Sequence, residues 1–122
     1  MDYSNHFVNS SLIITTINKA NRNLYNFAHG CKLKKWKFII IGDKKTPKNF
    51  YIKNADYLNL ENQKKQNFKF AKKCPVNNYA RKNIGYLKAF ENKSEVIIET
   101  DDDNYPLKSF FNNYSLEQKI IK

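Results

Sequence analysis

The sequence predicts an α/β fold with a mostly parallel sheet and flanking helices. Two short runs, residues 11–17 and 36–41, are apolar and β-branched without helical periodicity, which is typical of strands covered on both faces. The segment between them repeats apolar residues at helical spacing. Because strands that alternate with helices form parallel sheets with crossover connections, this order favours an α/β domain.

The first half of the chain predicts a strand, a helix and a second strand. Residues 11–17 form the first strand, and Asn18 ends it. A helix follows from residue 20 to about residue 35, and Gly30 is expected to end or bend it. Its apolar face consists of Leu24, Phe27, Ala28 and Cys31. Residues 36–41 form the second strand, which stops at Gly42 and Asp43.

A short strand and a helix are predicted in the middle of the chain. Residues 57–60 have the composition of a short strand, and residues 61–70 place apolar side chains at helix-like intervals. Cys74 and Pro75 interrupt the chain, since Pro cannot continue a helix. We therefore expect one helix before this break and a new helix after it.

The last third of the chain predicts a helix, a strand and a final helix. Asn77 or Asn78 can cap a helix over residues 79–92. Its expected apolar face consists of Ala80, Ile84, Leu87 and Phe90. Residues 96–100 form a strand, and Tyr105 with Pro106 opens a helix that runs through Phe110 and Phe111.

Length and composition limit the classes of function. The 122 residues suffice for one domain, and 41% apolar residues suffice for a core. The net charge of +11 comes almost entirely from scattered lysines, with Arg22 and Arg81 as the two arginines, so nucleic-acid binding is not favoured. Cys31 and Cys74 show no metal-binding spacing and are expected to be reduced. Without a signal peptide or an apolar run of about 20 residues, we expect a cytoplasmic protein with no membrane span.

Three adjacent carboxylates follow the strand at residues 96–100. Adjacent carboxylates repel each other unless protons, hydrogen bonds or a cation compensate. In extended backbone Asp101 and Asp103 point the same way, with Asp102 between them, so both can face one Mg²⁺ or Mn²⁺ ion. The alternative interpretation is that Asp103 or Asn104 caps the next helix and that the other acids are solvated.

Two cations, Arg81 and Lys82, stand in the first turn of the helix over residues 79–92. Cations there oppose the helix dipole, whereas a bound anion would make them favourable. They are therefore candidates for phosphate binding, although a lysine-rich chain also explains Lys82.

Polar residues at the other strand ends are candidates for nucleotide contacts. Asp43 can accept hydrogen bonds from a base or ribose, or it can cap the following turn. Thr15, Thr16 and Asn18 can contact a nucleotide or serve the structure alone. In open parallel sheets, ligands bind beyond the carboxyl ends of the strands, where all these clusters are expected. The sequence has no P-loop and no GxGxxG motif.

Several segments resemble the STELLO-type glycosyltransferases and, more distantly, the reversibly glycosylated polypeptides. The similarity covers about residues 11–106, and its most specific part is ARKNIGYLKAF followed by IIETDDDN. The matching segments are IITTIN (13–18), WKFIIIGDKKTP (36–47), YLNLENQ (57–63), ARKNIGYLKAF (80–90) and IIETDDDN (97–104).

The resemblance implies a GT-A-like fold and a metal-dependent transfer of sugar from a nucleotide-diphosphate sugar to an acceptor that the sequence does not identify. By this analogy a DxD-like motif at Asp101 and Asp103 binds Mn²⁺ or Mg²⁺, and Arg81 and Lys82 lie near the phosphates. The analogous nucleotide pocket is lined by Thr15, Thr16, Ile17, Asn18 and Asp43.

A complete domain of this kind continues past the acidic motif. We therefore expect residues 1–122 to form a single, incomplete nucleotide-sugar-binding domain, with another copy or another chain completing the sheet. The alternative is a non-catalytic nucleotide-binding or protein-interaction module on the same truncated fold.

Overall fold

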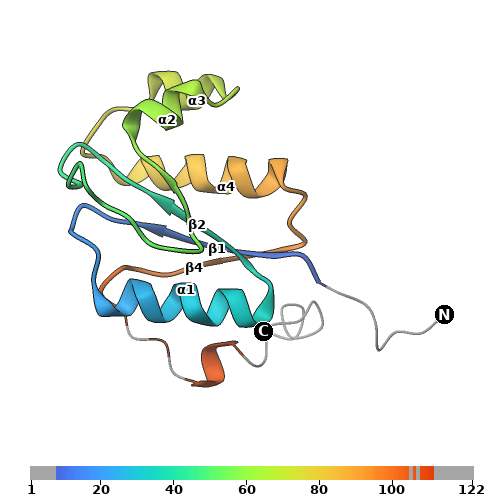
Figure 1. The fold of residues 1–122 in the computed structure, drawn as a ribbon. Coiled ribbons are helices and arrows are strands. Elements are labelled where there is room, and N and C mark those ends of the chain that lie inside the picture. Colours follow the sequence, from blue (N-terminus) through green and yellow to red (C-terminus); the bar gives the residue numbers. More distant parts are fainter. Residues whose placement is uncertain (1–7, 105, 107, 112–122) are drawn as a thin grey trace.

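The computed structural model describes residues 8–104, 106 and 108–111. Within these residues, four parallel strands form one sheet in the order β3-β2-β1-β4, with helices on both faces (Figure 1). The predicted parallel α/β architecture is thus confirmed. The strands are β1 (Ser10–Thr15), β2 (Lys37–Ile41), β3 (Asp56–Leu58) and β4 (Val96–Glu99).

The central strand β1 is buried on both faces, as its apolar run predicts. Leu12 and Ile14 belong to the core cluster that packs against helix α1, whereas Ile13 belongs to the cluster on the opposite face. All three side chains have no exposed surface. Because successive side chains in a strand point to opposite faces, a continuous apolar run is what a sheet between two helical layers requires.

Helix α1 (Arg22–Lys34) covers one face of the sheet (Figure 1). The side chain of Asn21 caps its start by accepting a hydrogen bond from the backbone N–H of Leu24 at 2.9 Å. The helix runs through Gly30 without ending, contrary to expectation. The reason for glycine there is packing, because a Cβ atom at Gly30 would collide with the ring of Phe111.

Of the predicted final helix, the structure describes a 3₁₀ turn at Lys108–Phe111. The Phe110 ring lies 5.3 Å from the Phe27 ring of α1, centre to centre, in an edge-on arrangement. Residues 105, 107 and 112–122, on which part of that prediction falls, lie outside the described residues.

The opposite face carries helices α2 (Leu60–Lys65), α3 (Lys69–Lys73) and α4 (Lys82–Glu91). The single helix predicted over residues 61–70 is wrong, since the chain becomes extended at Gln66 and starts a new helix at Lys69. This break lets Phe68 and Ala71 pack against the core on the α4 side of the sheet.

A 3₁₀ turn at Tyr79–Arg81 leads into α4, and Asn78 caps this turn as predicted. Ile84 is buried and Ala80 packs against the core as predicted, whereas Phe90 is 65% exposed and Gly85 and Ala89 are buried instead. A Cβ atom at Gly85 would lie 2.6 Å from Cγ2 of Ile13 in β1. The close approach of helix and sheet at Gly85 therefore sets the rotation of α4.

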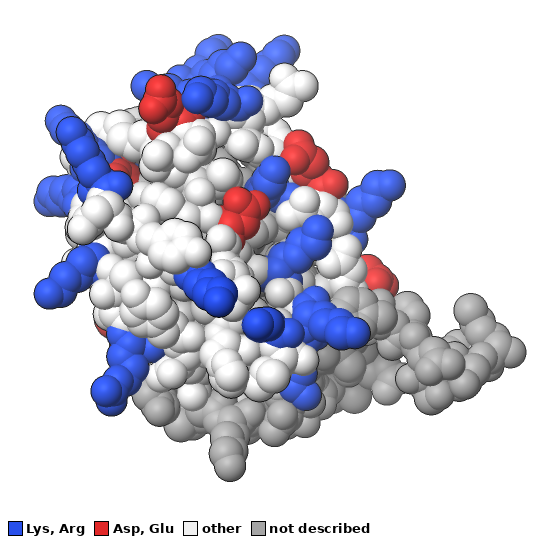
Figure 2. Space-filling model, viewed as in Figure 1, with Lys and Arg blue, Asp and Glu red and all other residues white. Residues whose placement is uncertain are grey.

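No helix among the described residues is long and apolar enough to cross a membrane. On the face shown in Figure 2, lysine and arginine side chains are spread widely over the surface, with a denser group over α2 and α3. The lysines of these two helices are Lys64, Lys65, Lys69, Lys72 and Lys73.

Replacing Gly85 by valine should destabilise the fold. The isopropyl group added at the contact with Ile13 overpacks this buried site, at a cost of about 1–3 kcal/mol. Thermal unfolding should show this as a drop of at least about 4 °C. Asn83→Val, at an exposed position of the same helix, is the control and should change stability by less than about 0.5 kcal/mol. Equal melting temperatures for the two variants would contradict the packing argument.

Candidate functional site

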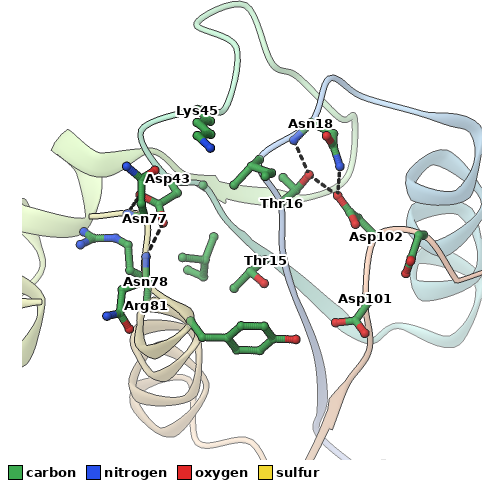
Figure 3. Close-up of a pocket in the computed structure, with 15 residues that line it drawn as sticks. Thr15, Thr16, Asn18, Asp43, Lys45, Asn77, Asn78, Arg81, Asp101 and Asp102 are labelled. Atoms are coloured by element: carbon green, nitrogen blue, oxygen red, sulfur yellow. Dashed lines mark hydrogen bonds between the residues drawn. The ribbon is translucent and has the colours of Figure 1, made fainter. Parts of the chain in front are cut away.

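A pocket of about 490 Å³ lies beyond the carboxyl ends of β1, β2 and β4 (Figure 3). From β1 the chain connects to β2 on one side, whereas β4 pairs with β1 on the other side. In open α/β sheets, ligands bind at such a reversal of strand order. The lining residues are Thr15, Thr16, Ile17, Asn18, Ile41, Gly42, Asp43, Lys45, Asn77, Asn78, Tyr79, Arg81, Asp101, Asp102 and Asp103.

The pocket brings together most of the predicted site residues. Thr15 at the end of β1, the three residues that follow it, Asp43 after β2 and the three acids after β4 all line it. Of the two predicted phosphate ligands, Arg81 lines the pocket, and Lys82 directly follows it at the start of α4. These predicted residues therefore meet at one place in the fold, and the contacts of each side chain indicate what it can do there.

The three acids lie in a turn, not in extended backbone. The backbone N–H of Asn104 donates to the carbonyl of Asp101 at 3.2 Å and closes the turn. Asp102 is directed at the loop after β1, where its carboxylate accepts hydrogen bonds from Thr16 Oγ1 at 2.6 Å and Asn18 Nδ2 at 3.1 Å (Figure 3). The expectation that Asp101 and Asp103 share one direction because of an extended strand is thus wrong in its premise. Asp102 instead anchors the turn.

The carbonyl of Asp102 strengthens this anchor. It accepts a hydrogen bond from Asn21 Nδ2 at 3.3 Å, and Asn21 is also the cap of α1. The acidic turn is therefore held to both the end of β1 and the start of α1. Asp101 and Asp103, in contrast, are exposed.

Asp43 links the loop after β2 to residues 77–78. Its Oδ1 accepts from the backbone N–H groups of Lys44 and Asn77, both at 2.7 Å, and its Oδ2 accepts from Asn78 N–H at 3.2 Å. This matches the capping interpretation of Asp43 and also links the loop after β2 to the entry of α4 (Figure 3). A contact between Asp43 and a base or ribose stays a prediction.

Arg81 and Lys82 have different surroundings. The Arg81 side chain is buried, and its guanidinium donates from Nε to Gln63 Oε1 at 2.9 Å and from Nη1 to the carbonyl of Cys74 at 2.8 Å. Nη2 is buried and has no hydrogen-bond partner among the described residues. The Lys82 ammonium lies instead 3.7 Å from Asp101 Oδ1. Lys82 is therefore the cation that accompanies the acidic turn, whereas a phosphate contact by Arg81 stays a prediction.

Gln63 is a buried residue that the sequence analysis did not single out, and it supports Arg81 behind the pocket wall. It has no exposed surface, and its Nε2 donates to the carbonyls of Gly42 and Leu58, each at 2.8 Å. Together with the bond from Arg81, these contacts join the ends of β2 and β3 to α4. The sequence offers one weak signal: Leu60, three residues before Gln63, lies on the same side of α2. That spacing does not reveal that Gln63 is buried.

Neither cysteine lines the pocket, and both are free thiols. Burial raises the pKa of the Cys31 thiol far above its usual range, and burial also raises the pKa of Cys74. Both thiols are therefore protonated at neutral pH, so neither is a nucleophile in this site.

The carboxylate oxygens of the acidic turn suit a hard cation that takes most of its ligands from phosphate groups and water. Among the described residues, no group of three or more His, Cys, Asp or Glu side chains converges as a metal site would. With Asp102 engaged, Asp101 and Asp103 are the carboxylates that line the pocket and are exposed. One or two carboxylates, with phosphate oxygens and water, are a common ligand set for Mg²⁺.

Comparison with known proteins finds two similar sequences from Arabidopsis thaliana. Probable glycosyltransferase STELLO2 is 34% identical over 71 residues, and Probable glycosyltransferase STELLO1 is 30% identical over 71 residues. Over this stretch, the chain is related to the STELLO glycosyltransferases. The stretch is 58% of this chain but 9% of the length of either STELLO protein. No family model matches the chain.

The anchoring role of Asp102 can be tested separately from the rest of the acidic turn. Asp102→Ala leaves Thr16 and Asn18 without their acceptor and should cost about 1–3 kcal/mol of unfolding free energy. Asp103→Ala, at an exposed neighbour, should change it by less than about 0.5 kcal/mol. Denaturant unfolding monitored by circular dichroism measures both. A larger loss in Asp103→Ala than in Asp102→Ala would contradict these roles.

Proposed function

We propose that the pocket binds the diphosphate of a nucleotide-diphosphate sugar together with Mn²⁺ or Mg²⁺, and that the chain is the donor-binding part of a glycosyltransferase. One observation carries the proposal: the loops after β1, β2 and β4 and the start of α4 meet in one pocket at the reversal of strand order. The relationship to the STELLO glycosyltransferases supports the same class of substrate.

Each side of the pocket has a role in this proposal. Asp101 and Asp103 are the residues that would hold the cation, and Lys82 adds a positive charge next to them. When bound, the cation would stabilise the negative charge that develops on the departing nucleoside diphosphate. Thr15, Thr16, Ile17, Asn18 and Asp43 form the wall for the nucleotide.

The hydrogen bonds of Asp102 and Asp43 give the pocket a fixed shape. Each carboxylate ties two segments that are far apart in the sequence, residues 16–18 with 102 and residues 43–44 with 77–78. A site that is already ordered loses less conformational entropy when its ligand binds. In the proposal these two acids therefore position the walls and do not touch the cation.

The proposal includes a partner at one edge of the sheet. Among the described strands, β4 pairs with β1 on one side and has a free edge on the other. Another copy or another chain would pair with β4 at this edge.

A second candidate function is metal-independent nucleotide binding without catalysis. The observation that favours it is the Lys82 ammonium, which already lies within 4 Å of two carboxylates, Glu99 and Asp101. An acidic turn that has a cation of the chain beside it can accept a diphosphate without a metal.

The two functions differ in their response to metal. With a panel of nucleoside diphosphates and their sugars, for example UDP and UDP-glucose, we expect the melting temperature to rise by several degrees when Mn²⁺ is present. The double variant Asp101→Ala/Asp103→Ala should lose this rise, because it removes both carboxylates available to the cation. Differential scanning fluorimetry measures the shift.

Asp56→Ala is the matched control, since Asp56 is an exposed carboxylate at the opposite, amino end of β3. It should retain the full metal-dependent shift. An equal rise with and without Mn²⁺ would support the metal-independent function instead. No rise with any nucleotide in either condition would refute both.

A further inference from the structure

Lys82 is a nearly buried cation between two partly exposed carboxylates. Its Nζ lies 3.7 Å from Asp101 Oδ1 and 3.9 Å from Glu99 Oε2. Its side chain is 9% exposed, compared with 50% for Glu99 and 54% for Asp101. The chain therefore provides a positive charge of its own beside the acidic turn.

The contacts of this ammonium are electrostatic and not directional. Both distances exceed the usual 2.7–3.2 Å of an N–H···O hydrogen bond, and the partners are half-exposed, so water screens the attraction. The third neighbour is the ring of Tyr79, whose centre is 5.5 Å from Nζ. Such contacts hold a cation weakly and allow it to change partner.

The position of Lys82 at the start of α4 also favours a change of partner. Lys82 is the first residue of α4, where the partial positive charge of the helix dipole disfavours a cation and favours an anion. Asp101 compensates for this in the structure as it stands. An anionic phosphate at the helix start would compensate at least as well.

We infer that Lys82 exchanges partners when the ligands bind: it neutralises Asp101 in the free protein, releases Asp101 to the divalent cation, and then pairs with the diphosphate. This inference rests on the proposed function. It implies that the cation alone has to displace Lys82 from Asp101, whereas the diphosphate gives the ammonium a new partner. Cation and diphosphate therefore favour each other's binding, and this coupling is reciprocal.

Two separate titrations test the exchange, one with Mn²⁺ alone and one with inorganic pyrophosphate alone. Lys82→Met removes the competing charge, so it should bind Mn²⁺ about threefold to fivefold more tightly than the unaltered protein. The same variant should bind pyrophosphate more weakly by a similar factor. Electron paramagnetic resonance of free Mn²⁺ measures the first affinity, and calorimetry measures the second. A merely structural role for Lys82 would not move the two affinities in opposite directions.

Lys88→Met is the matched control. Lys88 lies on the same helix and pairs with Glu91 at 3.1 Å, so this variant loses the same charge from a side chain that contacts Gln66 and Glu91 instead of the acidic turn. It should leave both affinities within about twofold of the unaltered protein. Lys82→Arg keeps the positive charge and should bind Mn²⁺ as the unaltered protein does. Lys82→Gln repeats the test with a polar side chain if Lys82→Met does not fold.

The outcomes separate this inference from the function on which it rests. Equal Mn²⁺ affinities in Lys82→Met, Lys82→Gln and Lys88→Met, with clear binding in the unaltered protein, would overturn the exchange and leave the proposed function standing. Absence of Mn²⁺ binding in the unaltered protein and in every Lys82 variant would overturn both.

Discussion

The hydrogen bond from the Thr16 hydroxyl to the Asp102 carboxylate is the contact on which the site depends. Thr16 is buried, and its Oγ1 also accepts the backbone N–H of Asn18, while its carbonyl accepts a hydrogen bond from Thr46 Oγ1 at 2.7 Å. One residue thus links the loops after β1, β2 and β4. Because a pocket made of three separate loops keeps its shape only if the loops are tied together, these bonds matter more than any lining side chain by itself.

The strands and the meeting of the candidate residues at one sheet edge were predictable because they follow from local patterns and one topological rule. The apolar runs at residues 11–17 and 36–41 became β1 and β2 with small changes at their ends. Parallel strands bring their carboxyl ends to one edge, so the residues after β1, β2 and β4 had to meet there. Predicting that these residues meet requires no knowledge of side-chain directions, because it follows from the strand order alone.

The predicted side-chain directions were wrong where they depend on the tertiary structure. The sequence shows three acids in a row, but a turn and the Thr16 hydroxyl together decide that Asp102 faces inward. Likewise, Arg81 and Lys82 are adjacent and look alike in the sequence. In the structure the first reaches Gln63 in the interior and the second reaches Asp101. Neighbouring residues on a helix differ by about 100° in direction, so two adjacent buried cations can reach different partners, one in the interior and one in the acidic turn.

The acidic turn also changes the argument for a metal ion. Three adjacent carboxylates suggest a cation because their repulsion needs compensation. Here Asp102 accepts two side-chain hydrogen bonds, Asp101 lies near an ammonium, and Asp103 is exposed to water. The turn is thus compensated by the chain alone, and repulsion is no longer a reason to expect a metal. The position of Asp101 and Asp103 supports a cation instead, because both line the pocket at the reversal of strand order and neither accepts the hydrogen bonds that hold Asp102. The ammonium of Lys82 beside them is held by contacts weak enough to exchange.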